Sequence, residues 1–62
     1  MEIRNYFEAM IQQVEDKITE QEICLQFTED INVRQEIRFR LASLLLERQS
    51  YRQMLQNMKG EN

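Results

Sequence analysis

The sequence of 62 residues contains no proline, histidine or tryptophan, and it has only one glycine and one cysteine. Proline and glycine are the residues that most often interrupt a helix, so no break is expected before Gly60. Because Cys24 is the only thiol, the chain cannot form a disulfide with itself. Without histidine it also lacks the usual ligands of a structural zinc site, and a base that would activate the thiol as a nucleophile.

The acidic residues make no better case for catalysis. Adjacent carboxylates such as Glu15 and Asp16 lack the Glu-x-x-His motif that binds metal pairs in helical bundles, and a single glycine cannot supply a phosphate-binding loop. We interpret Cys24 as a buried structural thiol and the carboxylates as members of solvated helix faces. The sequence therefore predicts a protein that is not an enzyme and holds no metal or cofactor.

Long apolar runs are missing too. No stretch of about 18 apolar residues could cross a membrane, and the first residues do not resemble a signal peptide. We therefore expect a soluble, cytoplasmic protein with a single domain over residues 1–62. A core this small rarely supplies more than about 3–5 kcal/mol. Since neither a disulfide nor a metal adds to it, self-association is the remaining source of stability.

Two apolar stripes are present, each with the alternating four- and three-residue steps of a helix face. The first runs through Phe7, Ile11, Val14, Ile18, Gln21, Leu25 and Thr28, and the second through Ile37, Leu41, Leu44, Arg48, Tyr51, Leu55 and Met58. The predicted oligomer core consists of Phe7, Ile11, Val14, Ile18, Leu25, Ile37, Leu41, Leu44, Tyr51 and Leu55. Ile3, Met10 and Leu45 are expected to widen the stripes.

The two stripes are out of phase, which indicates a hairpin rather than one long helix. Continued past Thr28, the first stripe would run through Asn32, Gln35, Phe39, Ala42, Leu46 and Gln49. Three candidate N-cap residues, Thr28, Asp30 and Asn32, lie at the phase change. We predict a turn near residues 29–33 and a C-terminal stop at Gly60. The fold class is thus all-α, a two-helix antiparallel hairpin, and two hairpins are expected to assemble into a dimeric four-helix bundle.

Charge is divided unevenly within a net charge of −3. Residues 1–31 carry eight acidic and two basic side chains, whereas residues 32–62 carry three acidic and six basic ones. Folding back at the turn would bring Glu29 near Arg34, Glu22 near Arg38 or Arg40, Glu15 near Arg48, and Glu8 near Arg52. Each exposed pair contributes only about 0–1 kcal/mol, so their value is to set register. The pairs could form within one hairpin or between two.

Two polar residues interrupt the stripes. Gln21 and Arg48 are expected at the same height in the antiparallel hairpin, where such residues commonly fix register or oligomeric state. In the alternative interpretation, Arg48 binds a carboxylate on a partner protein.

Five apolar residues lie outside both stripes, and they are Ile23, Phe27, Phe39, Ala42 and Leu46. The last three recur with the i, i+3, i+7 spacing of a helix face. Either these five residues complete the core of a homo-oligomer near the turn, or they form a docking patch for another protein.

The apolar residues outside the stripes, rather than any catalytic motif, indicate the function. We predict a small protein-interaction module, such as a regulator, adaptor or inhibitor of the kind common among phage and mobile-element products, with itself and another protein as partners. The alternative is an RNA-binding hairpin, because a basic stripe on the second helix could follow phosphates, and it consists of Arg34, Arg38, Arg48, Arg52 and Lys59. In outline the chain resembles the Rop family, plasmid-encoded RNA-binding hairpins that dimerise into four-helix bundles, although it shares no residue motif with them.

Overall fold

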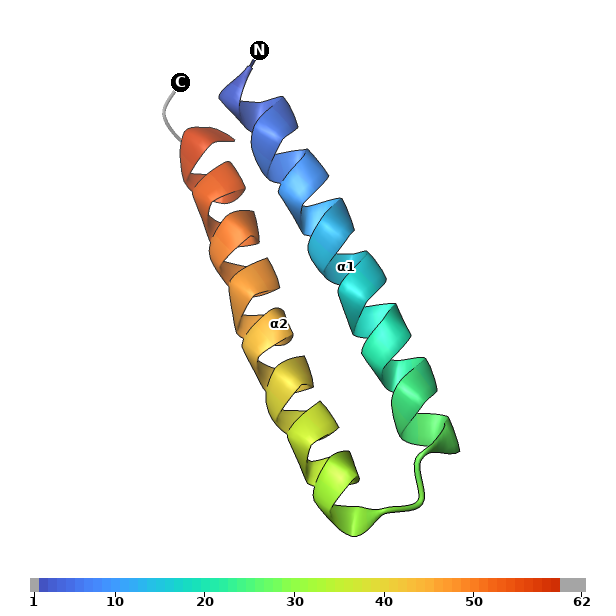
Figure 1. Ribbon diagram of the computed structural model, residues 1–62. Coiled ribbons are helices and arrows are strands. Elements are labelled where there is room, and N and C mark those ends of the chain that lie inside the picture. Colours follow the sequence, from blue (N-terminus) through green and yellow to red (C-terminus); the bar gives the residue numbers. More distant parts are fainter. Residues whose placement is uncertain (1, 60–62) are drawn as a thin grey trace.

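The computed structural model describes residues 2–59, with side chains as far as Met58. It shows two long α-helices that form an antiparallel hairpin (Figure 1). Helix α1 spans Ile3–Phe27 and helix α2 spans Ile31–Lys59. The start of α1 and the end of α2 lie together, at the opposite end of the hairpin from the turn. The predicted all-α hairpin is therefore confirmed, and the Cα atoms extend over 49 × 17 × 12 Å. The predicted stop at Gly60 lies outside the described residues.

The turn is short, and Asp30 fixes where α2 begins. Its Oδ1 accepts hydrogen bonds from the backbone N–H groups of Asn32, at 2.8 Å, and Val33, at 3.2 Å. These two N–H groups lie in the first turn of α2 and have no acceptor within the helix, so a carboxylate in this position stabilises the helix start. The turn occupies residues 28–30 instead of the predicted 29–33, because Asp30 acts as the cap and Asn32 already belongs to α2.

Arg34 ties the end of α1 to the start of α2. Its Nη1 donates to the carbonyl oxygens of Leu25, at 2.8 Å, and Thr28, at 2.9 Å. Carbonyls in the last turn of a helix have no N–H partner within it, so a cation here meets both a hydrogen-bonding need and the negative end of the helix dipole. The predicted pairing of Arg34 with Glu29 is wrong, because the backbone carbonyls occupy the guanidinium instead. Thr28 completes the end of α1 by donating its hydroxyl to the carbonyl of Cys24, at 2.6 Å.

The two predicted stripes form the contact between the helices, since every residue in both is buried or half-buried. Val14, Ile18 and Ile37 are the buried hydrophobic residues, and they are only 2% to 7% exposed. Near the open end of the hairpin, the rings of Phe7 and Tyr51 meet with centroids 5.9 Å apart. The facing sides of the helices are therefore those that the periodicity predicted, whereas a role for the stripes in an oligomer stays a prediction.

The buried surface is narrower than predicted. Met10 is half-buried beside the first stripe, but Ile3 and Leu45 are exposed. Leu45 follows the half-buried Leu44, and one residue along a helix rotates the side chain by about 100°. The two helices contact each other only along the facing stripes, so residues at the margins of the stripes stay in contact with water.

Candidate interaction surfaces

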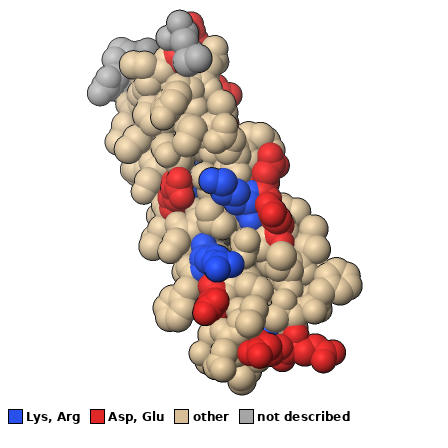
Figure 2. Space-filling view, viewed as in Figure 1, with Lys and Arg blue, Asp and Glu red and all other residues tan. Residues whose placement is uncertain are grey.

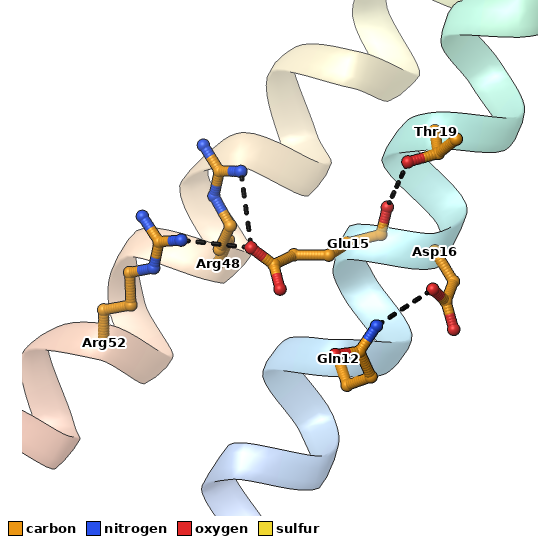
Figure 3. A network of polar contacts seen from close by, with 6 residues as sticks. All are labelled: Gln12, Glu15, Asp16, Thr19, Arg48 and Arg52. Carbon is orange, nitrogen blue, oxygen red and sulfur yellow. Dashed lines mark hydrogen bonds and ion pairs between the residues drawn. The ribbon is translucent and has the colours of Figure 1, made fainter.

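A cluster of one acidic and two basic residues crosses between the helices near their middle (Figure 3). Glu15 Oε2 accepts a hydrogen bond from Arg52 Nη2 at 3.1 Å and lies 3.9 Å from Arg48 Nη1. The predicted pairing of Glu15 with Arg48 is confirmed within one hairpin. Arg52 also binds Glu15 rather than Glu8, because the two arginines are one helical turn apart and share the same carboxylate. All three side chains are partly exposed, so each pair contributes at most about 1 kcal/mol.

The other predicted ion pair across the helices is not formed. Among the described residues, no ion pair within 4.0 Å joins Glu22 to Arg38 or Arg40. All three residues are exposed, and long side chains in water gain little by holding one geometry. Glu8, Glu15, Glu22 and Glu29 recur at intervals of seven residues, but among the described residues only Glu15 forms ion pairs across the helices.

The remaining polar contacts on α1 are local. Gln12 Nε2 donates to Asp16 Oδ1, and the Thr19 hydroxyl donates to the backbone carbonyl of Glu15, each at 3.1 Å (Figure 3). Each of these exposed contacts joins residues one helical turn apart on α1. They therefore do not connect α1 to α2. No set of three or more potential metal ligands gathers anywhere in the part of the chain that is described.

The predicted basic stripe is mostly occupied by contacts within the chain. Arg34 donates to backbone carbonyls, and Arg48 and Arg52 bind Glu15. Arg38 is exposed, and the side chain of Lys59 lies outside the described residues. On the face drawn in Figure 2, basic and acidic groups lie side by side and do not gather into one basic patch.

Gln21 and Arg48 do not lie at the same height, which corrects the prediction that they meet. Arg48 is level with Glu15, whereas Gln21 borders a shallow hollow together with Ser43 and Leu44. Six residues of helix separate these two levels, which is about 9 Å along the axis. Gln21 nevertheless has a notable environment, because its Oε1 is buried and has no hydrogen-bond partner among the described residues.

Cys24 is exposed and free, which corrects its interpretation as a buried thiol. Its neighbour Leu25 belongs to the stripe that faces α2 and is half-buried. Since consecutive side chains point about 100° apart, Cys24 is directed away from the contact.

The five apolar residues outside the stripes are all exposed, including Phe27 at 82%, Phe39 at 76% and Leu46 at 66%. They divide between two surfaces. At 3.6 residues per turn, Ile23 and Phe27 lie about 160° from the stripe on α1 that faces α2. By the same measure, Phe39, Ala42 and Leu46 lie about 145–175° from the buried stripe on α2. Because the buried stripes face each other, these two sets lie on opposite sides of the hairpin.

The surface of the outward side of α2 is hollowed at two places. One hollow is lined by Gln35, Arg38, Phe39 and Ala42, and the other by Leu46, Gln49, Ser50, Gln53 and Met54. A third hollow lies between the helices and is lined by Lys17, Glu20, Gln21, Phe39, Arg40, Ser43 and Leu44. Phe39 therefore separates the hollow between the helices from the outer one.

The accessible surface of the hairpin is larger than that expected for a compact protein of the same mass. Its accessible surface is 5156 Å², whereas a compact protein of 7.6 kDa exposes about 4300 Å². The excess of about 900 Å² is close to the 800 Å² or so that one partner buries in a standard protein interface. Neither of the two described helices has the length and apolar character needed to cross a membrane.

Comparison of this chain with protein-family models, curated proteins and solved structures found no match. The case for a function therefore depends on the contacts and the surface of the hairpin.

Proposed function

We propose that this chain is a self-associating protein-interaction module that forms a four-helix homodimer and acts as a small regulator, adaptor or inhibitor. The observation that carries the proposal is the large apolar surface left over after the two helices have paired. Phe39 and Leu46 are more than half exposed in the middle of α2, where an ordinary solvated helix would carry polar side chains. Exposed apolar patches of this kind mark interaction sites in small proteins.

Stability supports the same proposal. Burying one large apolar side chain contributes about 1.5–3 kcal/mol, and among the described residues three such side chains are buried, Val14, Ile18 and Ile37. The other residues of the two stripes are only half-buried, so the contact between two helices gives this chain a small core. A second copy that covers the exposed apolar residues would add the missing burial without a disulfide or a metal.

Protein contact is favoured over RNA binding because most residues of the basic stripe already have oxygen partners within this chain. Three of its members, Arg34, Arg48 and Arg52, already bind carbonyl or carboxylate oxygens of this chain. An RNA phosphate would have to compete with these contacts. The exposed free thiol of Cys24 fits a reducing compartment such as the cytoplasm.

Sedimentation equilibrium over a range of micromolar concentrations tests the proposal. We expect the mass to approach twice 7.6 kDa as concentration rises, together with a melting temperature that rises with concentration, as mass action requires. A well-folded helical monomer throughout the range would refute self-association. Binding to mixed RNA across a salt series is the second arm, and a steep loss of affinity with salt would instead support phosphate contacts by the arginines.

A further inference from the structure

A stripe of six residues with steps of four and three runs along the side of α2 that faces away from α1. We call this the outer stripe, and it consists of Gln35, Phe39, Ala42, Leu46, Gln49 and Gln53. We propose that the outer stripe is a homodimer interface at which a second copy packs its own α2 in antiparallel orientation. The inference rests on the proposed self-association and adds to it the face, the partner helix and the orientation.

The outer stripe is uncharged although α2 is rich in charge. Helix α2 has eight charged residues among its 29. From Gln35 to Gln53, every charged residue of α2 except Arg38 falls outside a sector about 120° wide that is centred on the outer stripe, and Arg38 lies at the edge of that sector. A helix face that remains in water normally carries charges, whereas the centre of a protein interface is depleted of them. The composition of the stripe is therefore that of a covered surface.

The outer stripe matches itself when it is reversed. Its members are placed symmetrically about position 44, so that a two-fold axis there pairs Ala42 with Leu46 of the second copy, and the reverse. The same axis pairs Phe39 with Gln49 of the second copy and Gln35 with Gln53 of the second copy. Facing positions then combine a large side chain with a small or flexible one, as close packing requires. A parallel pair would instead place Phe39 against its own copy and leave a gap between two alanines.

The hollows on α2 fit this two-fold arrangement. One is lined by residues around Phe39 and the other by residues from Leu46 to Met54. They lie on either side of position 44 at similar distances along the helix. The two-fold axis therefore brings the Phe39 ring of each copy toward the hollow between Leu46 and Met54 of the other copy, as in knobs-into-holes packing.

Charge on the flank of the stripe does not oppose this contact. The antiparallel arrangement brings Arg38 of one copy toward Arg52 of the other. Arg52 is already bound to Glu15 at 3.1 Å, which offsets its charge and places a carboxylate near the approaching Arg38. The second copy is the occupant that the surface supports, because the outer stripe is complementary to itself and the excess area of about 900 Å² is close to the roughly 800 Å² that one partner contributes to a standard dimer.

The first experiment compares two single charge insertions. Leu46→Glu places a carboxylate in the centre of the outer stripe, and we expect it to halve the sedimenting mass to that of the monomer with helical circular dichroism retained on cooling. Phe27→Glu is the matched control, because Phe27 is even more exposed, at 82%, but lies on α1. We expect this variant to remain a dimer. A Leu46→Glu protein that dimerises as tightly as the wild type would overturn the inference.

Disulfide trapping tests the antiparallel orientation of the two α2 helices. Its result does not depend on whether the Leu46→Glu protein folds. In a Cys24→Ser background, Gln35→Cys and Gln53→Cys chains are made separately, oxidised alone and oxidised after mixing. The antiparallel interface predicts crosslinked heterodimers from the mixture and little crosslinking in either chain alone. Homodimers from each chain alone would overturn the orientation, and no crosslink in a wild-type-like dimer would show that another face associates. Only a monomeric wild-type protein would refute the proposed function itself.

Discussion

Replacing Ile37 by alanine should cause the largest loss of stability of any single truncation in α2. Ile37 is 3% exposed and, among the described side chains of α2, is the only buried apolar one in the contact with α1. Isoleucine-to-alanine changes in protein cores cost about 2–5 kcal/mol, and the lower half of this range applies where neighbouring side chains can move into the space. In a two-layer hairpin both flanks of the site are open to water, so we expect about 2–3 kcal/mol.

This cost is large relative to the total free energy of unfolding. At about 0.05–0.15 kcal/mol per residue, a chain of this length has a free energy of unfolding of about 3–9 kcal/mol. A domain of this size loses roughly 4–8 °C in melting temperature for each kcal/mol, so Ile37→Ala should lower the midpoint by about 10–20 °C. Thermal and urea unfolding followed by circular dichroism, at one fixed protein concentration, would measure both quantities.

Phe27→Ala is the control for this experiment. It removes a larger side chain, but Phe27 is 82% exposed, and substitutions at exposed positions usually change stability by less than about 0.5 kcal/mol. Equal losses of stability for Ile37→Ala and Phe27→Ala would show that burial between the two helices does not stabilise the hairpin, and would refute this prediction.

Three further predictions concern the polar contacts of the hairpin. Asp30→Ala should destabilise the protein by about 0.5–2 kcal/mol because the first N–H groups of α2 lose their acceptor, and Asp30→Asn should retain most of the stability in the same urea titration. Arg34→Met should cost about 1–3 kcal/mol because two carbonyls at the end of α1 lose a charged donor, and faster amide hydrogen exchange confined to that end would locate the effect. Gln21→Leu should raise the melting temperature, since it removes a buried oxygen that has no partner; a lowered midpoint would show that Oε1 is bonded in solution.

The helices and their contact could be predicted because helical periodicity is a local property. The positions of Val14, Ile18 and Ile37 in their stripes determine which side of each helix is buried, with no knowledge of the partner helix. The turn was harder to place, since Thr28, Asp30 and Asn32 are all residues that favour the N-cap. Composition ranks these candidates nearly equally, whereas the folded hairpin admits only one cap, and it is Asp30.

The polar contacts could be predicted only in part, because they depend on atoms that a residue pattern does not specify. The spacing of Glu15 and Arg48 gave one ion pair correctly, but Arg52 competes for the same carboxylate from one turn away. The backbone carbonyls that bind Arg34 carry no signal in the sequence, since every residue has one. The height of Gln21 depends on the exact register, and an error of one or two turns is enough to misplace it.

The phase change between the two stripes explains how α2 can carry an exposed apolar stripe in addition to the stripe that meets α1. Continued beyond the turn, the stripe of α1 passes through Phe39, Ala42 and Leu46, but the turn rotates α2 so that a different stripe meets α1. Helix α2 therefore carries two stripes on nearly opposite sides, one covered by α1 and one exposed.

The outward side of α1 is different, because Asp16 and Glu20 accompany the exposed apolar residues there and make it a solvated surface. In the proposed dimer the two α2 helices lie at the centre and the two α1 helices lie outside them, so that charge insertions in the outer stripe of α2 should separate the subunits while charge insertions on the outward side of α1 should not.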